Sequence, residues 1–476
     1  MWAMALFVWT FVFMVIDYFL FNRDYFHPSF IFSMMFFLSS VFCLICAKDY
    51  SIHLHVGTFL VLFFTQFLFT ATSAIIENSN KSSHRSQEVL CKVKKIEVPR
   101  IAVFALLFIQ FVTIFFFIKH LRAFSISYDG VGRSLSESID LYDKISKFHP
   151  LVFARKEPPA PILYRIGDPI SRAGGFVCLY ILINNFIITK KIDILYVIPV
   201  VGLCAVIFLR GSRSPLLRIL TMALILYYIL GYRFSHIRKG DIRVISKFLI
   251  IVLVSAIGFM LMLPLMGRRG AEESGGLLNY SFIYIGGPLL NLDSIVSKGK
   301  VWLFGSINPS LVWGNYTFGG FYSILGGKLN FEHFDPMFTT IGGWAKSENG
   351  LNTGNVYTHF YTMLYDFGYV GTIIVNCIFI GYYCISYHKV IHDHSDNVFD
   401  FRLFLYTYLF NDLVMSIFAA RFFETLSSKS FLKVMFVSYV FSIFLNKRIE
   451  WVNNRVIIHL RSDYSVRTKL RHIFNK

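Results

Sequence analysis

Apolar residues along this chain come in long blocks that are separated by shorter polar stretches. Each block has close to the twenty or so apolar residues that a helix needs to cross a bilayer. The predicted spans are Trp2–Leu20, Phe30–Ala47, Leu54–Ile76, Ile101–Ile118, Ala173–Thr189, Ile194–Leu209, Pro215–Tyr232, Phe248–Met266, Phe367–Tyr387, Leu403–Ala420 and Phe431–Leu445. The pattern predicts an all-α polytopic integral membrane protein of about eleven or twelve spanning helices, with residues 1–476 in one helical domain.

Basic residues gather in the segments that follow the third, fifth and seventh spans and in the tail over residues 446–476. Lysine and arginine in short loops mark the cytoplasmic side of a membrane protein. In an eleven-span arrangement all four segments fall on one side, so we expect them in the cytoplasm and the N-terminus outside. We expect the first span to be an anchor, because it lacks the flanking pattern of a removable signal.

Two polar segments, residues 119–172 and 267–366, are far longer than a connection between helices requires. Both fall on the outer side in this arrangement. The first is basic and includes Arg165 and Arg172, and the second is rich in glycine and aromatic residues, among them Trp302, Trp313 and Trp344. We therefore expect function to lie on the outer face.

Composition agrees with the pattern of blocks. Of the 476 residues 55% are hydrophobic and only 16% are charged, and the mean hydropathy is +0.57, which excludes a soluble domain. The net charge of +18 reflects the cytoplasmic basic loops and attraction to anionic lipid headgroups, not nucleic acid. None of the seven cysteines falls in a predicted outer segment, so no disulfide framework is indicated.

The stretch "FLRGSRSPLLR" puts three arginines, Arg210, Arg213 and Arg218, where an outer turn leads into a span. Ser214 and Pro215 are typical of the N-cap and first position of a helix. A helix start combined with guanidinium groups favours binding of phosphate. The alternative is that these arginines reach outer-leaflet headgroups, and Arg218, one turn deeper, needs a partner or a wet cavity.

A second arginine pair, Arg268 and Arg269, follows the predicted eighth span where it leaves the membrane on the outer side. This pair could also reach lipid headgroups. If both clusters bind anions, the two phosphates of a membrane-embedded lipid pyrophosphate fit that depth.

The stretch "TGNVYTHFYTMLYDFGYVG" leads from the second long segment into the ninth span. His359 and Asp366 are seven residues apart and would share a face of one helix. His359 could act as a base toward a sugar hydroxyl or as a proton donor to a leaving phosphate. The alternative is an interfacial helix start, where tyrosine and histidine are common.

Other candidates carry weaker signals. "HDHSD", His392 to Asp396, resembles a metal cluster but falls in a cytoplasmic loop, where a solvated loop is the simpler interpretation. Asn411 and Asp412 lie inside the tenth span, as a functional site or as a hydrogen-bonded helix pair. Trp313 and Trp344 could stack on sugars or anchor the interface. The sequence has no nucleotide-binding loop and no outer acidic motif for metal-dependent glycosyl transfer.

With these features in view, the chain resembles the Wzy-type O-antigen polymerases of bacterial envelopes, which join oligosaccharide repeat units. The resemblance rests on the two large outer loops, on "LRGSRSPLL", and on "NVYTHFYTMLYDFGYVG" before a late span. The related O-antigen ligases carry a His-Asn pair where this chain has Gly354 and Asn355. The family resemblance implies a fold similar to the GT-C-type membrane glycosyltransferases.

The resemblance also implies a reaction at the periplasmic face of the bacterial inner membrane. The growing glycan would leave its undecaprenyl pyrophosphate carrier and join a hydroxyl of the next lipid-linked unit, without metal, nucleotide or other cofactor. A chain-length regulator protein is an implied partner, beside the lipid-linked oligosaccharide and membrane lipids. The residues assigned to catalysis are Arg210, Arg213, His359 and Asp366; to pyrophosphate binding Arg210, Arg213, Arg268, Arg269, Arg165 and Arg172; and to sugar binding Trp313, Trp344, Tyr357 and Asn355.

Two other classes of protein share parts of this pattern. A lipid-linked oligosaccharide flippase would have the same composition and buried arginines, but with shorter loops and paired repeats. A membrane O-acyltransferase acting on sugars would place a histidine near an arginine in the first spans, for which Arg23 and His27 are the candidates. The product distinguishes the three: polymer, transported single units, or modified sugars.

Overall fold

The structure is a computed structural model, and it describes residues 2–81, 94–211, 214–241, 246, 276–299, 301–325, 334, 344–392, 397–452 and 455–460. Eight of the described helices are long and apolar enough to cross a membrane. They are α1 (Trp2–Leu20), α2 (Pro28–Ile45), α3 (Val56–Lys81), α4 (Arg100–Asp129), α7 (Ile162–Thr189), α9 (Ser214–Arg233), α14 (Phe360–His392) and α17 (Lys429–Asn446). The chain is therefore a helical polytopic membrane protein.

Two further helices that fall in predicted spans are shorter than these eight. They are α8 (Ile194–Phe208) and α15 (Phe401–Val414). The predicted span Leu403–Ala420 is interrupted, because α15 gives way to the 3-10 turn η3 (Met415–Ile417) and then to α16 (Arg421–Leu426). The predicted span Phe248–Met266 lies outside the described residues, so the count of eleven stays a prediction.

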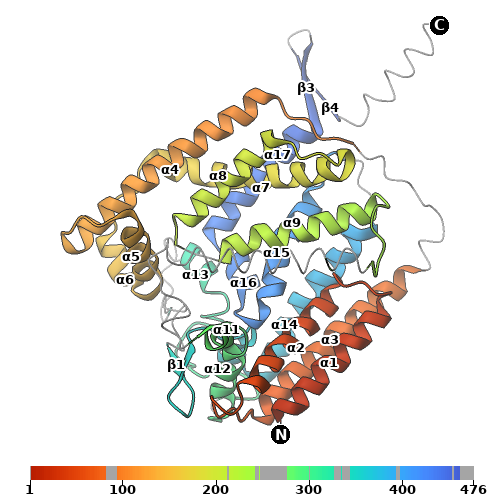
Figure 1. Ribbon diagram of the computed structural model, residues 1–476, viewed down its shortest axis with the longest axis vertical. Helices are drawn as coiled ribbons and strands as arrows, with labels where there is room; N and C mark the ends of the chain where they lie inside the picture. The colour runs from red at the N-terminus through yellow and green to blue at the C-terminus, as the bar shows by residue number, and fades with distance from the viewer. Residues whose placement is uncertain are drawn as a thin grey trace.

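The long helices pack in two groups (Figure 1). One group is α1, α2, α3 and α14, and α3 lies alongside α14. The other is α4, α7 and α8, with α9 and α17 packed on α7. The helix α15 joins the groups, because it packs against α9, α14 and α2. The hydrophobic core runs through both groups, from Leu6 near the start of α1 to Leu445 near the end of α17.

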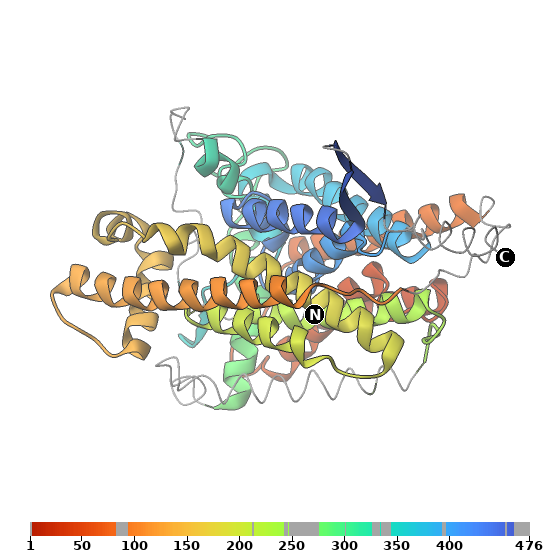
Figure 2. The same cartoon turned by 90° about the horizontal axis from the view of Figure 1, so that it is seen from above.

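Most of residues 119–172 is helical, which the pattern of apolar blocks did not predict. The helix α4 continues to Asp129 and stops at Gly130, which takes a left-handed conformation with φ 76°. Then follow α5 (Leu135–Phe148), α6 (Pro150–Lys156) and the start of α7, eleven residues before the predicted span. Ser134 and Glu137 start α5 with reciprocal capping bonds. Figure 2 shows α5 and α6 gathered at the far end of α4.

The described part of residues 267–366 packs against one end of the first helix group. It contains α11 (Leu277–Ile285), α12 (Gly287–Val296), α13 (Gly319–Leu325), β1 (Ala345–Lys346) and β2 (Asn352–Gly354). Asp293 of α12 accepts hydrogen bonds from the backbone of His55, at 2.7 Å, and from the Thr58 hydroxyl, at 2.6 Å. The rings of Phe148 and Trp344 lie 6.5 Å apart, so the two long segments meet at one end of the bundle.

The tail begins with an antiparallel hairpin of β3 (Lys447–Val452) and β4 (Arg455–Leu460). Lys447 pairs with Leu460, and the register continues to Val452 and Arg455 at the turn. Residues 461–476 lie outside the described part of the chain.

Candidate functional site

The turn that carries Arg210 is covered by the first long segment. Arg210 follows α8, and its neighbour Gly211 has φ +70°. A Cβ atom on Gly211 would lie 2.7 Å from the Cβ of Asp143 and 3.2 Å from the carbonyl oxygen of Ile139, both on α5. The turn therefore needs glycine for its conformation and for its close contact with α5. Ser214 is the first residue of α9, so it takes the first helical position and not the N-cap position that the sequence predicts.

A single carboxylate joins two arginines beneath this turn. Arg210 donates to Asp168 Oδ1 at 2.7 Å and to the Tyr164 hydroxyl at 3.1 Å, and Arg172 donates to Asp168 Oδ2 at 2.8 Å. Tyr164, Asp168 and Arg172 are four residues apart on α7, so they share one helix face. The Nε atoms of both arginines are buried without a partner in the described structure. Two guanidinium groups thus have more donors than their one acid can satisfy.

Arg218 lies within the predicted seventh span and is paired with a buried acid. It donates to Asp412 Oδ1 at 2.7 Å and to Thr425 Oγ1 at 3.2 Å, and its guanidinium lies 4.5 Å from the centre of the Tyr408 ring. The Asp412 side chain is fully buried. Of the two interpretations for Asp412, a contact between helices is what the structure contains: it joins α15 to α9.

A fourth arginine, Arg421, lies at the start of α16 near the Arg218 pair. It forms an ion pair with Glu424 at 2.9 Å, and its Nε atom is buried without a partner in the described structure. The short helix α16 thus contributes both Arg421 and the Thr425 hydroxyl that Arg218 contacts. Sequence reasoning missed Arg421, because it follows the end of a predicted span and is not in a predicted outer loop.

His359 lies immediately before α14 and is fully buried. Its Nε2 contacts Asn376 Oδ1 at 2.8 Å, and the Asn376 amide nitrogen donates to the Thr372 carbonyl. The amide oxygen therefore faces the ring, so Nε2 carries the proton and Nδ1 holds a free lone pair. In the described structure Nδ1 has no partner. The rings of Phe379 and Phe423 lie 4.3 and 6.3 Å from His359.

Asp366 organises backbone and does not contact His359. Its carboxylate accepts from the backbone N–H of Tyr316 at 3.0 Å and of Thr317 at 2.6 Å. His359 lies one residue before α14 begins, so it and Asp366 do not share a helix face as expected, and α14 breaks two residues after Asp366, where Gly368 takes φ 68° and ψ −168°. The Trp302 carbonyl accepts from the Tyr369 N–H at this break. The described contacts thus give Asp366 a structural position at the helix kink.

Of the remaining predicted residues, five lie in the described part of the chain. Trp313 and Trp344 are exposed, with 69% and 62% of their surface accessible. The rings of Tyr357 and Tyr361 lie 4.1 Å apart, burial raises the pKa of Tyr357 to about 12, and Asn355 is half-buried. Arg165 is exposed on α7. Arg213, Arg268 and Arg269 lie outside the described residues.

The structure therefore brings Arg172, Arg210 and Arg218 to one end of the bundle, with Arg421 beside them. Sequence reasoning missed Asp168 and Tyr164, although their spacing to Arg172 was readable once α7 is known to start at Ile162. Two clefts, one lined by His27 and Glu77 and one by apolar residues of α1 and α3, lie apart from these arginines, which line neither of them. No group of three metal-ligating side chains occurs in the described chain.

Comparison with known proteins adds no assignment: no family model, no curated protein and no solved structure matches this chain.

Proposed function

We propose that this protein polymerises oligosaccharide repeat units carried on a lipid pyrophosphate, at the outer face of the bacterial inner membrane. The observation that carries the proposal is the pair Arg172 and Arg210, which share Asp168 and keep buried donors free beneath the α5 cover. Guanidinium groups bind phosphate oxygens in two-pronged fashion, and a membrane helix end is the depth of a lipid headgroup. The resemblance of the chain to the Wzy-type polymerases selects this substrate class.

In the proposed reaction the acceptor sugar hydroxyl attacks the anomeric carbon of the growing glycan. A new carbon–oxygen bond forms there, and the bond to the carrier phosphate breaks with its electron pair on the pyrophosphate. The arginines stabilise that growing negative charge, which is the largest contribution expected in such a transfer. The hydroxyl proton goes to a base, and His359 Nδ1 has the free lone pair for this role.

The helix α16 lies between the candidate base, His359, and the arginines at this end of the bundle. Phe423 of α16 stacks on His359, and Thr425 of the same helix accepts a hydrogen bond from Arg218. One short helix thus contacts the candidate base and the arginine region. Movement of α16 would change both positions together.

The test is the product made by the protein itself. A strain that lacks the gene should carry lipopolysaccharide with single repeat units, and the wild-type gene should restore the ladder of long chains on a gel. Purified protein in lipid nanodiscs should convert lipid-linked units to polymer and release the lipid pyrophosphate. Transport of units without polymer would support the flippase alternative, and acylated sugars would support the acyltransferase alternative.

A further inference from the structure

Asp17 is a fully buried carboxyl group about one turn before the end of α1. Its Oδ2 accepts from the Ser33 hydroxyl at 2.8 Å, and its Oδ1 accepts from the Thr70 hydroxyl at 2.7 Å. The Ser29 hydroxyl lies 3.1 Å from that of Thr70. Three helices thus enclose one acid in a cage of hydroxyl groups. Neither the arginine site nor the proposed reaction uses it.

No cation balances this carboxyl group within the described chain. Asp17 is absent from every ion pair there, whereas Asp412, Asp168, Asp24 and Asp400 each have a basic partner. Among titratable side chains, Cys384 of α14 lies close to the cage, and Glu77 of α3 and His27 before α2 line the same cleft as Cys384. An ionised carboxylate without a counter-charge is expensive inside a helical bundle in a membrane.

The hydroxyl cage suits either protonation state of Asp17. When the acid is charged, Ser33 and Thr70 donate to it, as observed. When it is protonated, its O–H can donate to one hydroxyl, which turns its own hydrogen to a carbonyl one turn earlier in its helix. Thr10 and Thr65 already bond in that way, to Leu6 and Val61, both at 2.8 Å. The site can therefore exchange a proton without rearranging helices.

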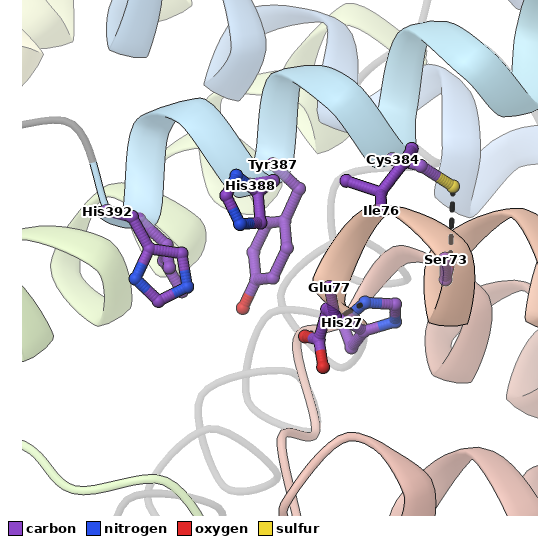
Figure 3. Close-up of a pocket in the computed structure, with 9 residues that line it drawn as sticks. His27, Ser73, Ile76, Glu77, Cys384, Tyr387, His388 and His392 are labelled. Atoms are coloured by element: carbon purple, nitrogen blue, oxygen red, sulfur yellow. Dashed lines mark hydrogen bonds and ion pairs between the residues drawn. The ribbon is translucent and has the colours of Figure 1, made fainter. Parts of the chain in front are cut away.

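A line of polar side chains leads from Asp17 toward a cleft. Gln66, Thr70, Ser73 and Glu77 are three or four residues apart on α3, so they lie along one face. Ser73 and Cys384 are 3.1 Å apart and line the cleft, together with His27, Glu77 and His388 (Figure 3). In Figure 3 His27 and Glu77 lie across the cleft from Tyr387 and His388. The basic loops predict that this end of the bundle faces the cytoplasm.

We propose that Asp17 is a proton-binding site inside the membrane, loaded through the cleft lined by His27, Glu77 and His388. A proton from water reaches the cleft, passes by way of Glu77 and Ser73, and forms an O–H bond on Asp17. The donor loses that proton and regains one from water, so one proton is taken up for each Asp17 that is neutralised. This site is independent of the proposed polymerisation.

Infrared difference spectroscopy of the full-length protein in detergent tests the site itself. Lowering the pH from about 8 to about 5 should produce the carbonyl band of a protonated carboxyl group. We expect Asp17→Asn to remove one component of this band, and proton uptake on the same pH drop to fall by one per protein. A band and an uptake identical to those of the wild type would overturn the proposal.

A matched pair of serine variants on α2 keeps the test valid even if Asp17→Asn does not fold. Ser33→Ala removes a donor to the charged acid, so the midpoint of the band should move to higher pH. Ser40→Ala removes a buried hydroxyl of the same helix that contacts Thr10 and not Asp17, so the midpoint should stay. Equal midpoints in all three proteins would show that Asp17 does not titrate.

The route is tested by the rate of proton uptake after a rapid drop in pH. Glu77→Gln should slow the component that Asp17→Asn removes, severalfold, without changing its final size. An unchanged rate would exclude loading through this cleft. None of these readouts depends on glycan synthesis, so they stand or fall apart from the proposed enzymatic activity.

Discussion

Asp412 and Asp17 are both fully buried acids in one helical bundle, yet their surroundings differ in one respect. Asp412 has the guanidinium of Arg218 at 2.7 Å, whereas Asp17 has only hydroxyl groups. A paired acid remains charged and ties its helix to a neighbour; an acid among hydroxyls can gain or lose a proton at little structural cost. The counter-charge, and not burial, therefore decides whether a membrane aspartate stays ionised or can bind a proton.

The same contrast separates the two ends of the bundle. At the end predicted to face outward, Asp168 binds two arginines, each of which keeps a buried Nε donor without a partner in the described structure. At the opposite end Asp24 is saturated by Lys239 at 3.1 Å and by the hydroxyls of Tyr228 and Tyr387. The donors left over at Asp168 can bind a ligand, whereas the fully hydrogen-bonded Asp24 holds neighbouring helices together.

The largest loss of stability is expected when the ion pair between Arg218 and Asp412 is broken. Arg218→Ala leaves a buried charge without its partner, which should lower stability by about 3–5 kcal/mol. The double variant Arg218→Met, Asp412→Leu should recover most of that loss, because no charge is left unpaired. Asp17→Asn should cost far less. Melting temperatures in one detergent measure all three, and equal losses for Arg218→Ala and Asp17→Asn would refute the comparison.

The second effect concerns the arginines that share Asp168. If Arg210 stabilises a leaving pyrophosphate, Arg210→Ala should reduce the polymerisation rate by about 10²–10³. Arg210→Lys should remain impaired, since lysine lacks the two-pronged contact. The assay is chain length on a gel at matched membrane abundance. Lys144→Ala, on the exposed face of α5, is the control and should leave chain length unchanged. Full activity of Arg210→Lys would favour simple contact with headgroups.

A smaller effect is expected from glycines of the first long segment and its covered turn. Gly211→Ala combines a left-handed φ with a collision against α5, so it should cost more than the roughly 1–2 kcal/mol of the conformation alone. Gly130→Ala has the conformation without the collision, and Gly132→Ala has neither. Thermal stability should therefore fall in the order Gly211, Gly130, Gly132. Any other order would argue against the close contact between the turn at Gly211 and α5.

The smallest effect is a dependence of stability on pH at His27. Burial lowers the pKa of His27 from 6.5 to about 3, and its Nδ1 accepts the Ser29 N–H that caps α2. The unfolded chain binds a proton at a pH where the folded protein does not, so stability is lost as pH falls from 6.5 toward 3. His27→Asn keeps a capping acceptor without a titrating ring. Its melting temperature should vary less with pH over that range than that of the wild type.

Much of the fold could be predicted, because a membrane helix requires a long apolar block that is visible in the sequence. The predicted Trp2–Leu20 coincides with α1, and the predicted starts of the second and third spans fall within two residues of α2 and α3. The helices α4 and α7 extend beyond their predicted spans as polar or mixed sequence. Hydropathy cannot detect that part, because its stabilising contacts are to α5 and α6 and not to lipid.

Of the candidate site, the sequence indicated that Arg218 and Asp412 are costly inside a membrane and need partners. Only the tertiary structure decided the partners. Arg218 meets an acid 194 positions later and Asp17 meets hydroxyls of two other helices. Pairing between distant helices depends on how their faces pack, and one helix's periodicity carries no information about its neighbour. That is why the arginine site was partly foreseen and the Asp17 cage was not.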